Sequence, residues 1–152
     1  MAWDFETDPE YQKKLDWVSE FIEQEVEPLT HVGVGLGGVK SKTYQKAIRP
    51  LQKKVKDMGL WACHLTPDLG GQGYGQVKLA LLNERLGRVG LAPVVFGCQA
   101  PDTGNAEIIS HYGTKEQKDR YLWPLLNNEI TSAFSMSEPT GGSDPLYFKR
   151  RA

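Results

Sequence analysis

The sequence predicts an all-α domain of five or six helices, followed by one short C-terminal strand. Apolar residues recur at helical spacing in several segments of residues 7–126. Two Thr-x-x-Glu/Gln patterns, a common signal for the start of a helix, precede two of these segments. The chain of 152 residues, 39% apolar and 24% charged, has the composition of a globular domain that can bury a core.

The first helix is expected to begin at a capping box formed by residues 7–10. Thr7 would be the N-cap, Pro9 would lie in the first turn, and Glu10 would reach back from the third position. The helix should end at Pro28, which cannot donate a backbone hydrogen bond. Its expected buried stripe is Tyr11, Leu15, Val18, Phe21, Ile22 and Val26.

Residues 31–40 are rich in glycine, and Gly33, Gly35 and Gly38 match the pattern GxGxxG. No predicted strand precedes these glycines, as a dinucleotide site would require. We therefore predict a flexible loop here, with His31 as a solvated loop residue.

Residues 41–58 carry a second apolar stripe, in which Pro50 is expected to start a new helix and Gly59 to cap its end. The stripe consists of Tyr44, Ile48, Leu51, Val55 and Met58. The glycine-rich residues 67–75 then resist regular structure. They read as a connector, and the sequence assigns them no chemistry.

Residues 77–91 and 92–111 predict further core helices. The buried face of the first is expected to contain Val77, Leu81, Leu82, Leu86 and Val89. Residues 114–117 form the second capping box, and the helix after it should stop at Pro124. His64 and His111 lie beside apolar residues and read as structural.

The segment 130–144 is an alternating apolar and hydroxyl run that breaks into a Pro-Gly turn. The alternation over residues 130–136 predicts a short strand. In the turn, Gly141 and Gly142 allow close approach of a ligand, and hydroxyl and N–H groups lie nearby. Such a turn suits a planar cofactor or a phosphate, although an ordinary polar turn after a strand is the alternative.

Charge and cysteine content exclude several classes of protein. A net charge of −1 argues against a general nucleic-acid or membrane-surface role. Cys63 and Cys98 are isolated, which indicates buried thiols and neither a disulfide framework nor a metal site. No apolar run reaches the ~20 residues of a membrane span, and no leader pattern is present. We expect a cytoplasmic protein.

The run Phe-Ser-Met-Ser-Glu-Pro-Thr-Gly-Gly-Ser-Asp at 134–144 resembles the flavin-binding signature of the acyl-CoA dehydrogenases. Four further segments resemble that family in the same order: 21–28, 67–75, 84–88 and 113–122. Residues 98–105 are similar to the long-chain branch that includes the human kinase-fused enzymes. The resemblance divides the chain into an N-terminal helical domain (1–129), the start of the middle β domain (130–144) and an atypical tail (145–152).

The resemblance implies oxidation of an acyl-CoA thioester to the 2,3-enoyl-CoA in fatty-acid β-oxidation, with FAD as cofactor. An electron acceptor such as an electron-transfer flavoprotein and a homo-oligomeric state are further implications. Ser143 matches the position that also meets the thioester's pantetheine arm, whereas Ser137 replaces the usual Thr and Thr140 the common Gly. The residues matched to flavin contacts are Phe134, Met136, Ser137, Gly142 and Ser143.

The family's catalytic base belongs to a later domain, so we nominate no catalytic residue and no metal ligand in this chain. Residues 145–152 depart from the family's continuation, which suggests a truncated product that is inactive on its own. The alternative function is a non-catalytic helical interaction module with an exposed apolar face. Flavin binding by the purified chain would separate the two functions.

Overall fold

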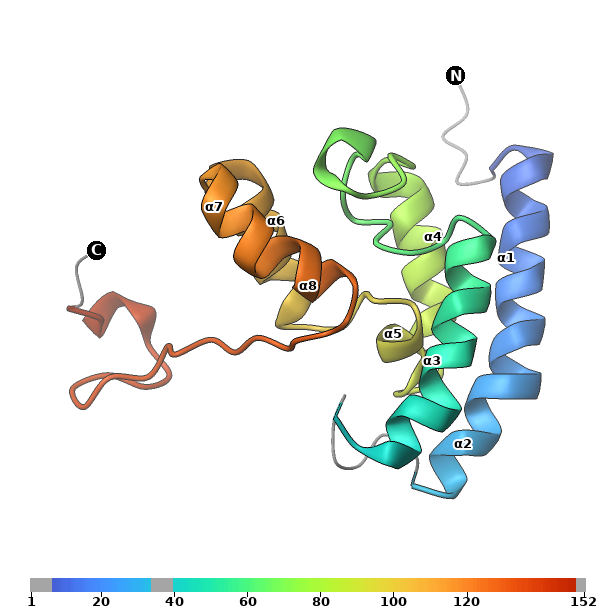
Figure 1. The fold of residues 1–152 in the computed structure, drawn as a ribbon, viewed down its shortest axis with the longest axis horizontal. Helices are drawn as coiled ribbons and strands as arrows, with labels where there is room; N and C mark the ends of the chain where they lie inside the picture. Colours follow the sequence, from blue (N-terminus) through green and yellow to red (C-terminus); the bar gives the residue numbers. More distant parts are fainter. Residues whose placement is uncertain (1–6, 34–39, 150–152) are drawn as a thin grey trace.

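The computed structural model describes residues 7–33 and 40–149, so most of the GxGxxG pattern lies outside the described residues. Within them the fold is helical, which confirms the predicted class (Figure 1). The helical segments of the described residues form six continuous helices. The first consists of α1 (Pro9–Phe21), the π-helical η1 (Ile22–Val26) and α2 (Glu27–His31), and the last consists of α7 (Lys115–Gln117), the π-helical η3 (Lys118–Leu122) and α8 (Trp123–Leu126). Between them lie α3 (Lys42–Asp57), α4 (Gln76–Leu86), α5 (Ala92–Val95) and α6 (Asp102–Tyr112). Short 3-10 turns occupy Pro67–Leu69 and Pro145–Tyr147.

The main core lies between α1, α3, α4 and α5, where α1 packs against α4 and α3 against α5. The predicted stripe of the first helix is entirely buried there. The stripe of α3 is also buried, except that Met58 at its end is half-buried. In α4 the prediction is wrong at Val77, which is 58% exposed at the start of the helix, while Leu82 and Leu86 are buried.

A smaller core packs α6 against the continuous helix of residues 115–126, through Ala106, Leu122 and Leu125. The partly buried Leu126 packs against both cores. The indole Nε1 of Trp61 also donates a hydrogen bond of 2.6 Å to the Leu126 carbonyl oxygen. The α6–α8 unit is therefore attached to the main helical layer through few, specific contacts.

The predicted helix ends are confirmed at two positions. Gly59 follows the C-cap residue Met58 of α3 and adopts φ +64°, a left-handed conformation that glycine reaches without strain. At the start of α7, the Gln117 N–H donates to Thr114 Oγ1 and the Thr114 N–H donates to Gln117 Oε1, which completes the capping box. At α1, however, the N-cap is Asp8 and not Thr7, since the Asp8 carboxylate accepts the Tyr11 N–H at 2.9 Å.

The structure contradicts the predicted helix ends at Pro28 and Pro124 and the predicted helix start at Pro50. Pro28 and Pro124 each follow a π-helical stretch by two residues. In these stretches the N–H groups of Glu27 and Trp123 reach back five residues, to Ile22 and Lys118. The wider turn shifts the hydrogen-bond frame and places each proline in the first turn of the next α segment, where its missing donor is tolerated.

Pro50 lies inside α3, which continues through it. Ile48 and Val55, on either side of this proline, are fully buried in the main core. Packing of both halves on one surface outweighs the local cost of the proline, so the predicted break does not occur.

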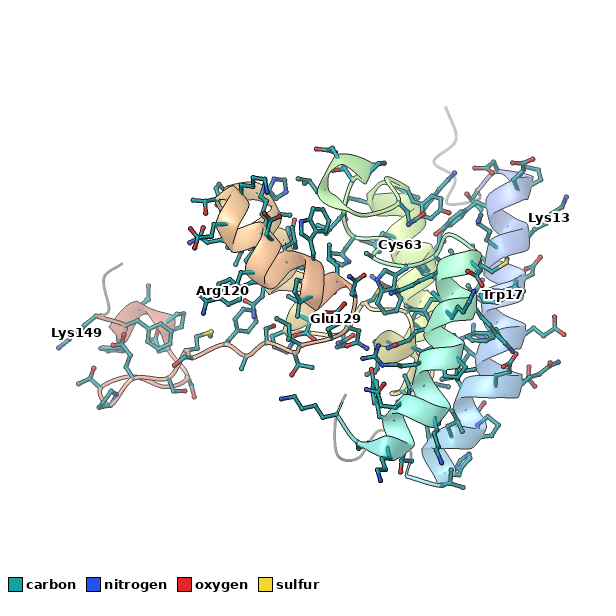
Figure 2. The ribbon with its side chains drawn as sticks, in the orientation of Figure 1. Lys13, Trp17, Cys63, Arg120, Glu129 and Lys149 are labelled. Carbon is teal, nitrogen blue, oxygen red and sulfur yellow. The ribbon has the colours of Figure 1, made fainter. Side chains whose placement is uncertain are left out.

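The predicted strand at 130–136 does not form: no regular structure is assigned to residues 131–137. In the described part of the chain the one β-type pairing is an isolated bridge between Glu138 and Gly141. A strand requires a neighbouring strand to satisfy its backbone groups, and none of the described residues supplies one. This segment leaves the helical body and carries the C-terminal end, where Figure 2 labels Lys149.

Candidate functional site

The five residues matched to flavin contacts all lie on one exposed segment. Phe134 is 54% and Met136 59% exposed, and Ser137 and Ser143 are exposed as well. A side-chain carbon added at Gly142 would meet no atom within 4 Å, so the backbone there is open to a ligand. These five residues thus present two apolar side chains and two hydroxyl groups to their surroundings.

The tight turn in this segment is closed by Glu138 and Gly141, which exchange backbone hydrogen bonds of 2.9 and 3.2 Å. The tail folds back onto this turn, because the Lys149 N–H donates to Glu138 Oε2 at 2.8 Å. The Asp144 carboxylate accepts the Leu146 N–H at 2.9 Å and starts the 3-10 turn of the tail. The sequence did not predict these contacts, since the tail carries no recognisable motif.

The first turn of α6 holds the start of the segment. The Asp102 carboxylate accepts hydrogen bonds from the Ser132 N–H (2.7 Å), the Ser132 hydroxyl (2.6 Å) and Gln99 Nε2 (2.8 Å). Asn105 Nδ2 donates to the same Ser132 hydroxyl at 2.8 Å. Sequence reasoning used residues 98–105 only as part of the family resemblance and missed this anchor, whose partner is 30 residues away.

A second buried polar cluster directs the chain into the segment. The amides of Gln52 and Asn128 both donate to the Tyr44 hydroxyl oxygen. Gln52 also donates to the Val94 carbonyl at 3.2 Å. Asn128 is 4% exposed and adopts φ +56°, a conformation that asparagine tolerates better than most residues. The cluster therefore fixes the turn that follows α8.

His64 borders a small cavity of about 10 Å³, close to the volume that one water molecule needs. Trp61, Gln99, Asp102 and Asn128 also line it. Among the described residues, neither ring nitrogen of His64 nor Gln99 Oε1 has a hydrogen-bond partner. Burial lowers the pKa of His64, and nearby Glu107 opposes that shift. The ring is thus held in its neutral form near pH 7.

Lowering the pH is expected to destabilise the fold through His64. Its pKa is lower in the folded chain than the ordinary value of 6.5, so the unfolded chain takes up this proton first. The free energy of unfolding should therefore fall as the pH drops below about 6.5, until the folded-state pKa is reached. Urea unfolding at several pH values checks this. His64→Gln should make the free energy of unfolding less dependent on pH, whereas His111→Gln, at an exposed position, should not. An equal slope of that free energy against pH in the unaltered chain and both variants would contradict the prediction.

The two cysteines are free thiols, Cys63 buried and Cys98 half-buried, and Figure 2 places Cys63 within the helical body. Burial raises the pKa of both thiols, that of Cys98 to about 11. Neither is a thiolate near neutral pH, so neither has the character of a nucleophile. Among residues 7–33 and 40–149, no group of three or more His, Cys, Asp or Glu side chains could hold a metal ion, and no helix is long and apolar enough to cross a bilayer.

Comparison with protein-family models matches residues 8–129 to the acyl-CoA dehydrogenase N-terminal domain. A curated relative, acyl-CoA dehydrogenase family member 11 of Rattus norvegicus, is 39% identical over 137 residues, which cover 87% of this chain and 17% of the relative. FadE2 of Mycobacterium tuberculosis, described as an acyl-CoA dehydrogenase, is 40% identical over 107 residues, covering 70% of this chain and 26% of that protein.

The fold is also similar to a solved structure described as an acyl-CoA dehydrogenase of Mycobacterium abscessus. The TM-score is 0.75 at 37% identity, with 93% of this chain and 37% of the other covered. The chain thus spans well under half the length of these relatives. The structural similarity includes residues beyond 8–129, since that range alone is a smaller share of the chain.

Proposed function

Because the chain belongs to the acyl-CoA dehydrogenase family, we propose that it serves the FAD-dependent oxidation of an acyl-CoA thioester to the 2,3-enoyl-CoA. In this proposal residues 1–129 form the N-terminal helical domain. Residues 130–144 are the start of the middle β domain and carry the flavin-binding motif. The atypical residues 145–152 are assigned to neither domain. The observation that carries the proposal is the exposed flavin-type motif placed directly after the matched domain.

The exposed residues of the motif fit a planar group with polar edges. Phe134 and Met136 offer apolar surface, and the hydroxyls of Ser137 and Ser143 offer hydrogen bonds. Gly142 has no side chain that would keep a ligand from its backbone. When bound, FAD supplies the hydride acceptor that this oxidation needs. In this proposal Ser143 also contacts the pantetheine arm of the substrate.

No side chain of this chain is proposed as the catalytic base. Glu138 lies in the motif, but its carboxylate accepts the Lys149 N–H, so it is engaged in the fold of the tail. The role proposed for this chain is binding and orientation. The proposal also includes a role in fatty-acid β-oxidation and an electron acceptor such as an electron-transfer flavoprotein. It further includes a homo-oligomeric state and a cytoplasmic location.

Flavin titration of the purified chain tests the proposal, with Gly142→Ala as the informative variant. The added methyl group has room in the folded chain, so the free energy of unfolding should change by less than about 0.5 kcal/mol. It should nevertheless lower FAD affinity by about tenfold, because a methyl would stand between the backbone and the ligand. Quenching of FAD fluorescence measures this, and Gly90→Ala, also free of neighbours within 4 Å, is the matched control.

Two results would count against a flavin site. One is the absence of FAD binding by the unaltered chain at millimolar FAD, and the other is equal affinity of the two alanine variants.

A specific observation favours the second candidate, a helical interaction module. Ile108, Tyr112 and Tyr121 are 56%, 85% and 42% exposed and border a groove of about 280 Å³. Concentration-dependent association without flavin binding would support that candidate.

A further inference from the structure

The buried Asp102 carboxylate at the start of α6 accepts most of its hydrogen bonds from the segment that leads into the flavin-type motif. Asp102 is 9% exposed and accepts three hydrogen bonds, two of them from Ser132. Hydrogen bonds to an ionised carboxylate are shorter and stronger than those between neutral groups. Gln99 fixes the other carboxylate oxygen, so the side chain is held from both sides. Asp102 is therefore a rigid attachment point for Ser132.

Segment 131–137 depends on such an attachment because it lacks a ladder of backbone hydrogen bonds. In the described part of the chain no backbone–backbone hydrogen bond involves residues 130–137. The segment is instead fixed on its two sides, by the backbone bond from Glu129 to Pro124 and by the turn at Glu138. Between these points, the hydrogen bonds to Ser132 are the ones that fix its position.

The attachment lies close to the first flavin-matched residue. Ser132 and Phe134 are two positions apart, about 7 Å along an extended chain. The Phe134 ring also rests against α6, with its Cζ atom 3.4 Å from where a side-chain carbon at Gly104 would lie. The same helical turn thus holds Ser132 by hydrogen bonds and Phe134 by contact, so a shift at Ser132 is transmitted to Phe134.

We propose that Asp102, assisted by Asn105, is a positioning residue that holds the flavin-contacting segment against the first turn of α6. This inference rests on the proposed function, since it takes residues 134–143 as the cofactor contacts. It adds a residue outside the motif: Asp102 acts through Ser132 and touches neither cofactor nor substrate. Loss of the carboxylate frees the segment, and FAD must then order it on binding, which weakens affinity.

Two variants of Asp102 separate positioning from general stability. Asp102→Ala removes every acceptor. Asp102→Asn keeps one oxygen that can accept the hydrogen bonds from Ser132. Its new side-chain N–H₂ can donate to Gln99 Oε1, which has no partner in the described residues, after the Gln99 side-chain amide flips. The matched control is Ser110→Ala, which removes a side-chain hydrogen bond of another buried polar residue on the same helix.

Hydrogen exchange of the Ser132 amide, measured without FAD, reports the anchor, and quenching of FAD fluorescence reports the cofactor site. Asp102→Ala should speed that exchange and weaken FAD binding by about tenfold or more, the equivalent of one charge-assisted hydrogen bond. Asp102→Asn should restore both values to within about threefold of the unaltered chain. Ser110→Ala should change neither. Should Asp102→Ala fail to fold, Ser132→Ala, which loses only the hydroxyl contacts, should shift both readouts in the same direction.

The outcomes distinguish this inference from the proposed function. Unchanged exchange at Ser132 in Asp102→Ala overturns the anchor. Faster exchange with unchanged FAD affinity overturns the positioning role and leaves the flavin site intact. Absence of FAD binding by the unaltered chain overturns the proposed function and the cofactor role of Asp102 together, while the exchange rates still decide whether Asp102 anchors the segment.

Discussion

Replacing Gly71 by alanine is expected to lower the free energy of unfolding by about 3 kcal/mol or more. A side-chain carbon at this position would lie 2.0 Å from the Leu65 carbonyl oxygen, 2.4 Å from its carbon and 2.6 Å from the Ala62 carbonyl oxygen. These are backbone atoms, and both oxygens accept hydrogen bonds, from the Gly73 and Leu65 N–H groups. The chain cannot move aside without losing the fold of this loop.

Urea unfolding followed by circular dichroism measures the effect, with Gly90→Ala as the matched control. An added carbon at Gly90 meets nothing within 4 Å, so its effect should stay within about 0.5 kcal/mol. Equal unfolding midpoints for Gly71→Ala and Gly90→Ala would contradict the prediction. The difference tests whether the glycine-rich loop of residues 67–75 needs glycine for close backbone contacts. The sequence alone assigned this loop no role.

Replacing Trp61 by alanine is expected to cost about 3–5 kcal/mol, the usual range for loss of a large buried aromatic side chain. Trp61 is 8% exposed, belongs to the main core and lines the same small cavity as Ala106 and Leu125 of the smaller core. Its ring lies against Gly97, where an added side-chain carbon would come within 2.7 Å of Cζ2. Its N–H holds the Leu126 carbonyl at the end of α8. The variant therefore removes core packing and a link to the α6–α8 unit in one change.

Trp61→Phe separates these two contributions, because it keeps much of the aromatic surface and loses the N–H donor. We expect it to cost about 1–3 kcal/mol, from the unpaired Leu126 carbonyl and the smaller ring. Unfolding curves recorded by far-ultraviolet circular dichroism give both values. A smaller loss for Trp61→Ala than for Trp61→Phe, or no loss in either, would show that Trp61 does not connect the two units.

The sequence alone determined the features that depend on neighbouring residues. The stripe of Tyr11, Leu15 and Val18 is set by 3.6-residue spacing, and the cap at Thr114 by the residue three positions later. Gly59 follows the same logic, because a left-handed residue after a helix favours glycine wherever the helix packs. Of the candidate site, the sequence identified the motif that contains Phe134 and Met136 by resemblance; their contact with a flavin stays a prediction.

Only the tertiary structure decided the features that depend on distant partners. The anchor from Asp102 to Ser132 and the cluster of Tyr44 with Asn128 join residues 30 and 84 positions apart, and a single sequence contains no period that reveals such pairs. Helices continue past Pro28 and Pro124 because π-helical turns shift the hydrogen-bond frame. The strand predicted at 130–136 does not form, because it also depends on a distant partner. The alternation of apolar and polar residues is a local pattern, whereas a strand requires another segment to pair with it.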